Sequence, residues 1–491
     1  MKTLYKSLLF GLAGLFMTSC GDLDINDNPN YPTVATPDML IPSGITWTAA
    51  QVGGDLQLLG GMWSQHYAQG NSSTQYGYMS EYNIKNSDFA RFWLAIYAGA
   101  LPDLYYAREQ AEASGEWGYW IPAQVMIAFD YHIAVDFYGT IPFTEAINAD
   151  ISAPKYDDGK TVNKGIIELL DAAIAKESDA NGKSSLENKD FVFKGDVAKW
   201  VEFARTLKLK ILMRDFDTNK AAISTLLQSG KFLSSDAKMD GFMDKENNSN
   251  PLYENDRRKL NTKNNIRANI TMVTFLQKNS DPRIAAFYDM PMEGDTYKGI
   301  VSGASTITQI VVPQSTISIA HLEATDPVYF MSVAESNFLQ AEAYARLGEK
   351  SKAKSFYDAG VTDAFARWSM ADKAAGFLTG AYAFDDSSIE SMIKSIITQK
   401  WIAAIRCQAW DSFFDINRTG YPELGSEYPV SSEDWETPNS KYVIGTLTPP
   451  VTSYLKAGEF PRRLLIAKNS SDNNQNAPAV IPLAEKMWWH K

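Results

Sequence analysis

Bulky apolar residues recur at helical spacing along much of the chain. The first such stripe consists of Phe89, Phe92, Trp93, Ile96, Tyr97, Leu101, Leu104 and Tyr105. This i, i+3, i+4, i+7 pattern is typical of one buried helix face. Ser87 and Asp88 precede the stripe and predict an N-terminal cap. Pro102 lies inside it, so we expect a kink or a break at that position.

The same spacing predicts two further helices. One runs from about Tyr119 to Tyr138 and stops at Gly139, a residue suited to a left-handed helix end. The other begins behind Gly195 and Asp196, and its apolar residues again form one stripe. The tryptophans on helical stripes are expected in the core: Trp93, Trp200 and Trp401.

The stretch "AEAYARLGEKSKAKSFYDAG" has the spacing of a tetratricopeptide helix-turn-helix. Its alanines let two antiparallel helices approach closely, and Gly348 permits the turn between them. One such unit cannot bury its own apolar face, so the helical pairs at 89–138 and 161–213 should stack with it. The fold class is therefore all-α. Long polar stretches interrupt the helices, and loops of that length are usually functional: 240–265, 290–325 and 415–450.

The N-terminus has the features of an exported lipoprotein. Lys2 and Lys6 precede an apolar run, Leu8 to Met17, which is too short to span a bilayer. The "MTSC" that follows resembles the lipobox of bacterial lipoproteins, in which Cys20 is lipidated and becomes the first residue. We therefore expect a signal peptide at 1–19, a lipid anchor and flexible tether at 20–42, and one folded domain at 43–491. An ordinary signal peptide with a chance cysteine is the alternative.

Charge narrows the range of partners. The formal net charge is −12, which argues against nucleic acid and against electrostatic docking on anionic lipid. Asp22, Asp24 and Asp27 follow the anchor and resemble the acidic signal that sends some lipoproteins to the cell surface. Calcium binding by "DLDIND" is the alternative, but Asp27 and Thr33 stand where a calcium loop needs glycine and glutamate.

Enzyme motifs are missing from the sequence. The four histidines are too scattered to show metal-ligand spacing, and we expect His132, inside a helix, to be a core residue. No nucleophile elbow, phosphate-binding loop or dinucleotide fingerprint occurs. The sequence therefore predicts a protein without catalysis, metal or cofactor, and a surface glycan-active hydrolase is the alternative.

Aromatic and amide residues alternate in "GMWSQHYAQGNSSTQYGYMSEYN", residues 61–83. Sugar rings pack their flat C–H faces on aromatic rings, while their hydroxyls need polar partners. The candidate ligand-binding residues are Trp63, Gln65, His66, Tyr67, Asn71, Tyr76 and Tyr78. In the alternative interpretation, these rings only fasten a long loop to the helical body.

Other conspicuous residues favour structural roles. Trp117, Tyr119 and Trp120 follow Gly115 at the start of a predicted helix, and Trp120 with Ile121 is expected to staple that start. Arg418 is expected to pair with a buried carboxylate or a loop carbonyl. The loop near Tyr297 is a further place for a ligand surface.

Several segments, spread over nearly the whole chain, resemble the SusD/RagB group of surface nutrient-binding lipoproteins. They are "DFYGTIPFTEA", "WVEFARTLKLKILMR", "NPLY", "DPRI", the repeat at 341–360, "TQKWIAAI", "NRTGYP", "PRRL" and the terminal "WWHK". Arg205 departs from the group's frequent asparagine, and "RCQAWDSFFDI" lacks its common glutamate. The resemblance implies a superhelix of tetratricopeptide-like helical pairs carrying a loop-rich subdomain.

The resemblance also implies a function and a partner. Members of this group lie on the outer membrane, face the cell exterior, and cap a SusC-type TonB-dependent barrel. They hand it oligosaccharides or, in some branches, peptides. We therefore expect this chain to bind nutrient oligomers, most plausibly oligosaccharides, and to deliver them to such a transporter.

Overall fold

The computed structural model describes residues 35–304 and 312–491, so Cys20, Asp22, Asp24 and Asp27 lie outside the described residues. The longer helices of the first half are α2 (Pro37–Val52), α3 (Asp55–Trp63), α6 (Leu101–Ser114), α7 (Trp117–Tyr138), α8 (Gly159–Ala175), α9 (Val197–Leu212) and α10 (Phe216–Gln228). Those of the second half are α11 (Ile270–Lys278), α13 (Val333–Arg346), α14 (Lys350–Ala366), α15 (Ala371–Leu378), α16 (Ile389–Ala403) and α17 (Ala409–Thr419). The short helices are α4 (Gly77–Ser80), α5 (Ala90–Leu94), α12 (Ile284–Phe287) and α18 (Lys468–Ser471).

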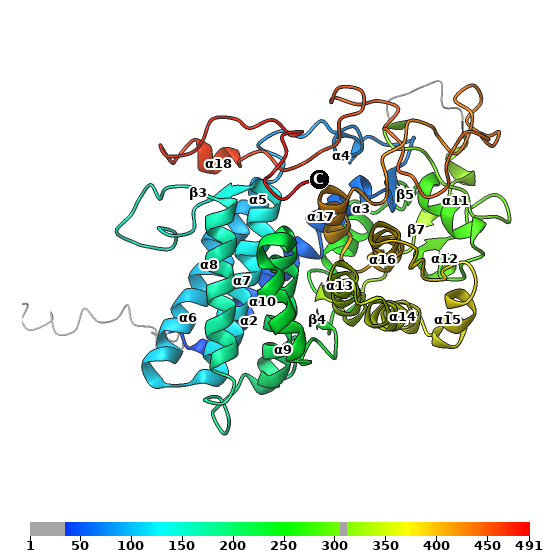
Figure 1. Ribbon diagram of the computed structural model, residues 1–491. Coiled ribbons are helices and arrows are strands. Elements are labelled where there is room, and N and C mark those ends of the chain that lie inside the picture. Colours follow the sequence, from blue (N-terminus) through cyan, green and yellow to red (C-terminus); the bar gives the residue numbers. More distant parts are fainter. Residues whose placement is uncertain (1–34, 305–311) are drawn as a thin grey trace, which may run out of the picture.

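The long helices form two groups (Figure 1). In the first group α2 packs on α6, and α6, α7, α8 and α9 follow one another as packed neighbours. In the second, α13 packs against both α14 and α16, while α17 packs on α3. The fold is thus a superhelix of tetratricopeptide-like helical pairs, as the sequence predicted.

The helical pair predicted around Gly348 is confirmed as α13 and α14. Gly348 has φ +79°, a backbone conformation that glycine adopts without strain. Ala341, Ala343 and Ala353 are fully buried, and α13 and α14 pack closely together.

The other helix predictions are mostly confirmed. α7 ends at Gly139 in the left-handed conformation, and Asp196 caps α9 by accepting backbone N–H bonds. The predicted cap by Ser87 and Asp88 is wrong, because Phe89 is the cap residue and no side chain bonds there. The core tryptophans are confirmed as buried: Trp93, Trp200 and Trp401.

The chain does not break at Pro102. It stays helical from α5 through α6, and the disturbance takes the form of a π-helical segment, η2 (Ala95–Ala100), just ahead of the proline. Proline lacks an N–H and its ring crowds the carbonyl four residues earlier. A wider turn at that place relieves the crowding without ending the helix.

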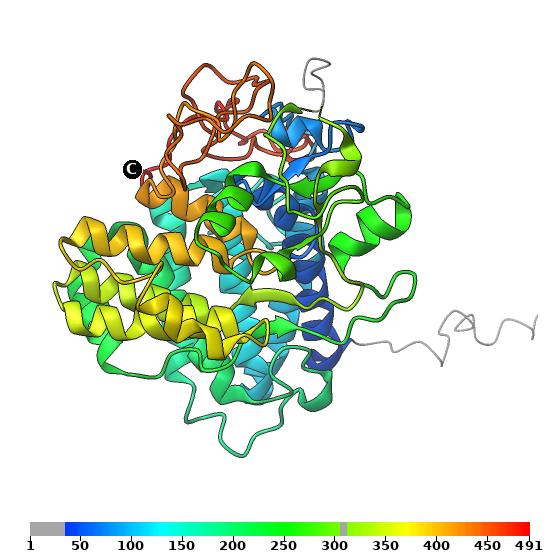
Figure 2. The ribbon, with the colours of Figure 1, turned by 90° about the vertical axis from the view of Figure 1, so that its right-hand side faces the viewer.

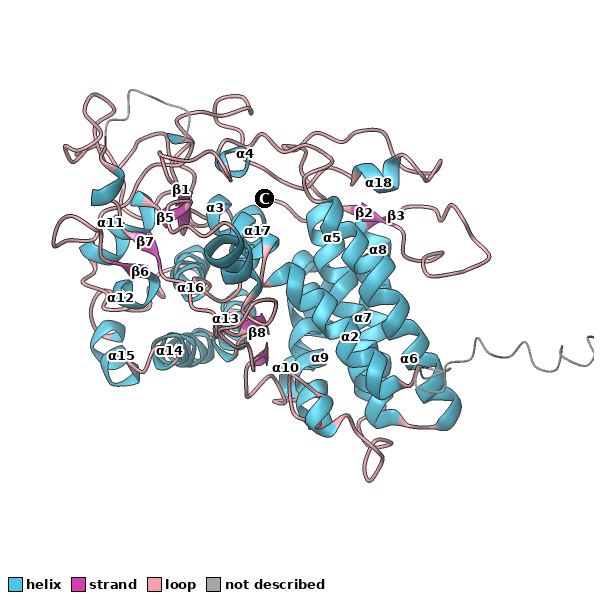
Figure 3. Cartoon of the chain, turned by 180° about the vertical axis from the view of Figure 1, so that it is seen from behind, coloured by secondary structure: helices cyan, strands magenta, loops and turns pink. Residues whose placement is uncertain are grey.

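The loop-rich part contains short strands that the sequence analysis did not predict. β1 (Tyr67–Gln69), β5 (Ile266–Ala268), β6 (Tyr288–Asp289) and β7 (Ile319–Ala320) form an antiparallel sheet in the order β1-β5-β7-β6. Figure 3 shows it among the long loops on one side of the second helical group. The remaining strands pair as β2 (Thr140–Ile141) with β3 (Asp157–Asp158) and β4 (Ala237–Met239) with β8 (Val328–Met331).

The tether expected at 20–42 ends early. α2 begins at Pro37, which occupies the first helical turn, and it continues through Pro42. Proline is well accommodated at a helix start, because the N–H that it lacks would have no partner there. The proline content of this stretch is therefore compatible with a helix.

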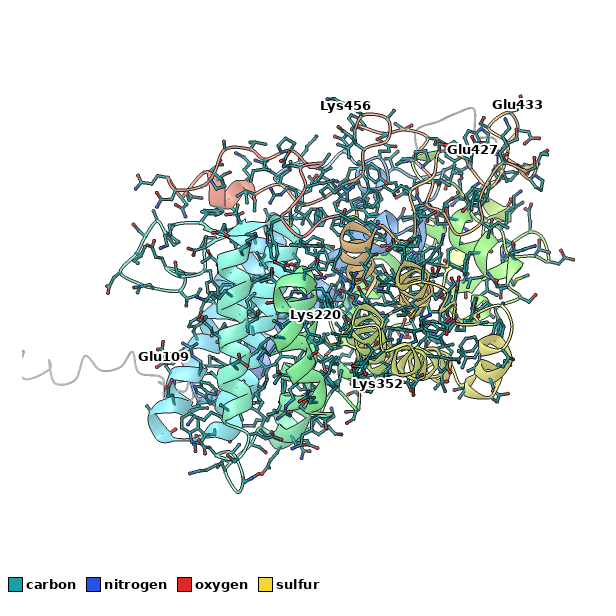
Figure 4. The ribbon with its side chains drawn as sticks, viewed as in Figure 1. Glu109, Lys220, Lys352, Glu427, Glu433 and Lys456 are labelled. Atoms are coloured by element: carbon teal, nitrogen blue, oxygen red, sulfur yellow. The ribbon has the colours of Figure 1, made fainter. Side chains whose placement is uncertain are left out.

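A buried charge network joins the two helical groups. It consists of Asp136, Lys210, Arg214, Glu335, Glu342, Lys400, Asp411, Asp415 and Arg418. Other charged residues lie exposed on the surface, among them Glu109, Lys220, Lys352, Glu427, Glu433 and Lys456 (Figure 4).

Two predictions fall within this network and are confirmed. Arg418 donates to Glu342 at 2.6 and 2.7 Å, the buried carboxylate partner expected of it. His132 is fully buried beside Asp136. Burial, together with Lys210 and Arg214, holds the pKa of His132 well below its ordinary value, so its ring is neutral.

Candidate functional site

The aromatic segment 61–83 is packed into the protein rather than laid open on it. Trp63 ends α3 with no exposed surface, and its indole N–H donates to the Met79 carbonyl at 3.1 Å. Its ring lies 4.7 Å from that of Phe413, between centroids. Trp63 therefore fastens the loop to α17, and its ring face is not available to a ligand.

The next three candidates are buried in the same way. Gln65 accepts from the Thr271 hydroxyl at 2.6 Å and from the Thr448 N–H at 3.0 Å, so it ties three distant segments together. His66 and Tyr67 lie within the core, with Tyr67 in β1. The expectation that Trp63, Gln65, His66 and Tyr67 form a ligand surface is therefore corrected. Aromatic and amide composition predicted contacts but not whether their partner was protein or ligand.

Tyr76 is buried too, and its backbone N–H donates to the Gln69 side chain at 2.7 Å. The expectation that Tyr76 contacts a ligand is therefore corrected as well. Asn71 and Tyr78 are half-buried, and the Asn71 amide donates to the Val312 carbonyl at 2.8 Å. Ligand contact by Asn71 and Tyr78 stays a prediction.

The Trp117 cluster is structural, as expected. Trp117 and Trp120 meet edge to face with ring centroids 5.7 Å apart. The Lys176 ammonium lies 3.9 Å from the Trp117 ring centroid, a cation–π contact that ties the start of α7 to the end of α8.

A hollow of about 730 Å³ lies where α5 and η2 meet two loops. We call it the amide hollow. Trp93, Tyr97 and Pro102 line the helical side, residues 142–154 line a second side, and α18 with the loop after it lines the third. In Figure 1, α18 lies above α5 and β3 at this end of the first helical group. Its volume is in the range of small-molecule sites.

Three aromatic rings lie in sequence beside the hollow. Trp93 stacks on Tyr97 at 4.6 Å between centroids, with 29° between the planes. Tyr156 continues the series on the other side of Trp93 at 6.0 Å and 22°. The Tyr97 hydroxyl donates to the Pro142 carbonyl at 2.8 Å, and Tyr156 shares a hydrogen bond with Ser470. These bonds hold the two loops against the rings.

Amide side chains supply the polar part of the hollow. Asn469, Asn473 and Asn474 come from the "NSSDNNQN" stretch. The Asn469 amide oxygen is buried and accepts no hydrogen bond from the described residues. An unsatisfied buried acceptor costs about 1–3 kcal/mol. The last torsion of an asparagine side chain is soft, so a turn of the amide toward a ligand donor in the hollow is favoured.

Backbone irregularities gather at the same place. Ile147, which lines the hollow, has φ +55°, a left-handed conformation that is strained for a β-branched residue. Such strain costs about 1–3 kcal/mol and clusters at ligand sites. The π-helical segment η2 contributes Tyr97 and Ala98, and π-helical turns are likewise frequent at functional sites.

The sequence analysis missed this hollow. The run of asparagines at 469–476 was a signal for it, since amides pair with ligand hydroxyls. The pairing of that run with Trp93 and Tyr97 could not be foreseen, because nearly 380 residues separate them; the Asn469 amide reaches the Ala90 carbonyl across the fold. The strain at Ile147 has no sequence signature.

Within residues 35–304 and 312–491, no group of three or more histidine, cysteine, aspartate or glutamate side chains could hold a metal ion. No helix in the described part of the chain is long and apolar enough to cross a membrane.

Comparison with known proteins identifies the fold family. Residues 29–443 match the model of the SusD-like family described as starch-binding and associating with the outer membrane. The chain belongs to the SusD-like family. No curated protein matches it.

Solved SusD-like structures agree in fold. A chitin-binding SusD homologue from Flavobacterium johnsoniae is 20% identical, with a TM-score of 0.70 over 91% of this chain and 98% of that one. A SusD/RagB family protein from Bacteroides thetaiotaomicron is 22% identical, with a TM-score of 0.70 over 93% and 99%. A SusD homologue from Bacteroides uniformis is 21% identical, with a TM-score of 0.69 over 92% and 99%.

Proposed function

We propose that this SusD-like protein binds nutrient oligosaccharides in the amide hollow. The observation that carries the proposal is the combination of stacked rings with a buried, unpaired amide oxygen at Asn469. A sugar supplies both complements, an apolar C–H face for the half-buried Tyr97 ring, which stacks on buried Trp93, and hydroxyl donors for the amide. The chitin-binding homologue supports an oligosaccharide as the ligand class.

Amide variants test this proposal. Asn469→Ala and Asn473→Ala should each weaken oligosaccharide binding about two- to tenfold, the worth of one hydrogen bond. Isothermal titration with chito-, malto-, cello- and xylo-oligosaccharides measures the change. Asn181→Ala is the matched control, because Asn181 is exposed on a loop outside the hollow. Unchanged affinity in both hollow variants would move the site elsewhere, with Asn71 and Tyr78 as the next candidates.

We further propose that Cys20 carries a lipid that anchors the protein to the outer membrane, facing outward. Two or three acyl chains give stable anchoring, whereas one gives only marginal binding. Cys20→Ala should release the protein from the membrane fraction or leave an unprocessed precursor. Replacing Asp22, Asp24 and Asp27 together by alanine should leave it anchored but shielded from protease added to whole cells. Cys407→Ala, at the buried free cysteine, is the control.

Delivery to a SusC-type TonB-dependent transporter completes the proposal. Family membership supports it. Affinity purification from membranes should recover a barrel protein with this one, and oligosaccharide uptake should fail in its absence. A peptide in place of an oligosaccharide is tested in the same titration. The appearance of reducing ends during incubation with glycans would instead support a hydrolase.

A further inference from the structure

A second hollow adjoins the amide hollow and has no role in what has been described. It has a volume of about 640 Å³ and lies between α2, the α5–η2 helix and the segment 239–259. We call it the Trp47 cleft. Figure 2 shows α2, in dark blue, running along this side of the molecule beside green segments of the chain.

Trp47 is the main aromatic surface of the cleft. It is 47% exposed, although tryptophan usually buries most of its surface. Its ring lies against Gly99 of η2, where an added Cβ would come within 2.8 Å of the indole Cδ2. The absent side chain at Gly99 therefore seats the ring, and the rest of its surface faces the cleft.

A polar group lies beside this ring. Gln51, one helical turn after Trp47 on α2, is only 5% exposed and lines the same cleft. Its amide oxygen is buried and accepts no hydrogen bond from the described residues. The last torsion of a glutamine side chain is soft, so the amide can turn to meet a donor in the cleft. The pairing of an aromatic face with an unpaired acceptor repeats the chemistry of the amide hollow.

The two hollows are neighbours. Leu94 and Ala98 line both of them, and Leu94 is 51% exposed on the ridge between them. A ligand in one hollow therefore meets the other across a low apolar ridge. Only an extended ligand with repeating ring faces and hydroxyls would match both sides.

We propose that the Trp47 cleft is a second subsite for the same oligosaccharide, so that the protein selects linear chains long enough to cross the Leu94–Ala98 ridge. This inference rests on the proposed function of the amide hollow. A second subsite raises affinity, because the second contact forms within an already bound ligand. Short oligosaccharides should occupy the amide hollow alone.

The experiment is a titration of chain lengths, from disaccharide to hexasaccharide, in the chito-, malto-, cello- and xylo- series. In the series that binds, the hexasaccharide should bind at least about tenfold more tightly than the disaccharide, the effect of about one stacked ring. Trp47→Ala should remove this gain without changing disaccharide affinity. Trp47→Phe, which keeps a ring over Gly99, should restore part of it. Tyr106→Ala is the matched control, since Tyr106 is 49% exposed on α6 and lines neither hollow.

The outcomes separate the two proposals. Equal affinity of Trp47→Ala and the unmodified protein for the hexasaccharide would overturn the second subsite and leave the amide hollow standing. If Trp47→Ala lost the same affinity for the disaccharide as for the hexasaccharide, the second subsite would also be overturned, because the Trp47 ring would then act in the first site. Failure of every series to bind the unmodified protein would overturn the oligosaccharide function itself, and the subsite with it.

Discussion

The buried charge network and the amide hollow both gather polar side chains, yet the two regions use them in opposite ways. In the network, Lys400 lies 2.6 Å from Asp411, 2.8 Å from Asp415 and 3.4 Å from Glu335. Burial alone would lower the pKa of Lys400, but these carboxylates outweigh it and raise that pKa. In the hollow, the Asn469 oxygen is buried and has no partner within the described part of the chain.

Polar groups that are fully paired within the protein stabilise the fold, whereas an unpaired polar group beside a hollow can bind a ligand. Burial tends to raise the pKa of Glu342, but Arg418 and Arg346 outweigh it and hold that pKa below its ordinary value. Because the Glu342 carboxylate is already paired with two arginines, it is poorly suited to bind a ligand. A neutral amide oxygen without a partner destabilises the fold much less than an unpaired charge does. A hydrogen bond from a ligand donor would offset this destabilisation.

The largest expected effect comes from breaking the network. Lys400→Met should lower the free energy of unfolding by about 3–5 kcal/mol, because the buried carboxylates of Asp411 and Asp415 would lose the cation that they share. Lys210 and Arg418 remain beside them, but each of these cations also pairs with a buried glutamate. Chemical denaturation measures the loss. Lys394→Met is the control: Lys394 lies on the same helix, is mostly exposed, pairs with exposed Glu423 and lies 5.6 Å from the centroid of the Tyr421 ring, so its removal should cost less than about 1 kcal/mol. Equal losses would mean that the network contributes nothing special.

Trp63 tests whether the aromatic segment at 61–83 stabilises the fold or binds a ligand. Trp63→Ala should lower the free energy of unfolding by about 3 kcal/mol, because the ring is fully buried against Phe413. Oligosaccharide affinity at low temperature should stay unchanged. Thermal unfolding paired with calorimetry gives both values. A stable variant that binds weakly would return Trp63 to the ligand surface.

Lowering the pH should destabilise the protein through His66, which is buried and neutral. Burial lowers the pKa of His66 from its ordinary value of about 6.5 to about 3. The unfolded chain therefore takes up the proton first, so stability is full above pH 6.5 and falls as the pH drops below it. Between pH 7 and pH 5 this histidine should cost about 2 kcal/mol. Between pH 7 and pH 5, the free energy of unfolding of His66→Gln should fall by about 2 kcal/mol less than that of the unmodified protein. Parallel pH profiles of stability for the two proteins would contradict the lowered pKa of His66.

The smallest effect is expected at the edge of the hollow. Tyr97→Phe removes the bond to the Pro142 carbonyl and should lower stability by about 1 kcal/mol, because the loop at 142–154 is then less firmly held. Oligosaccharide affinity should fall a few-fold. Tyr106→Phe, on the exposed face of α6, should change neither quantity. Affinity that stays constant would show that this loop takes no part in binding.

Local periodicity predicted much of the helical architecture. The stripe at α9, the largely apolar run of α7 and the small residues of α13 and α14 are contained within single segments, so the sequence records them directly. The short strands were missed because their pairing is between distant segments, as in β1 with β5. A two- or three-residue strand has too little pattern of its own to be recognised.

The candidate site was harder to predict, for a different reason. Residues 61–83 have the composition of a sugar site, but composition does not tell whether a ring faces solvent or core. Trp63 meets Phe413, and Gln65 meets Thr448, across hundreds of residues of sequence. The amide hollow likewise brings Trp93 beside the loop at 469–474. Only the folded chain decides which aromatic residues remain accessible.

The π-helical segment η2 also constrains how this part of the chain can vary. A π-helical turn takes up one more residue than an α-helical turn. Deleting one residue there would turn the wide turn into an ordinary α-helical turn and leave α6 in register with α5, so the shift would fall on the residues of η2 itself. Gly99 would then leave its place under Trp47, and Tyr97 its place beside Trp93. Relatives should therefore keep the spacing from Trp93 to Pro102 constant.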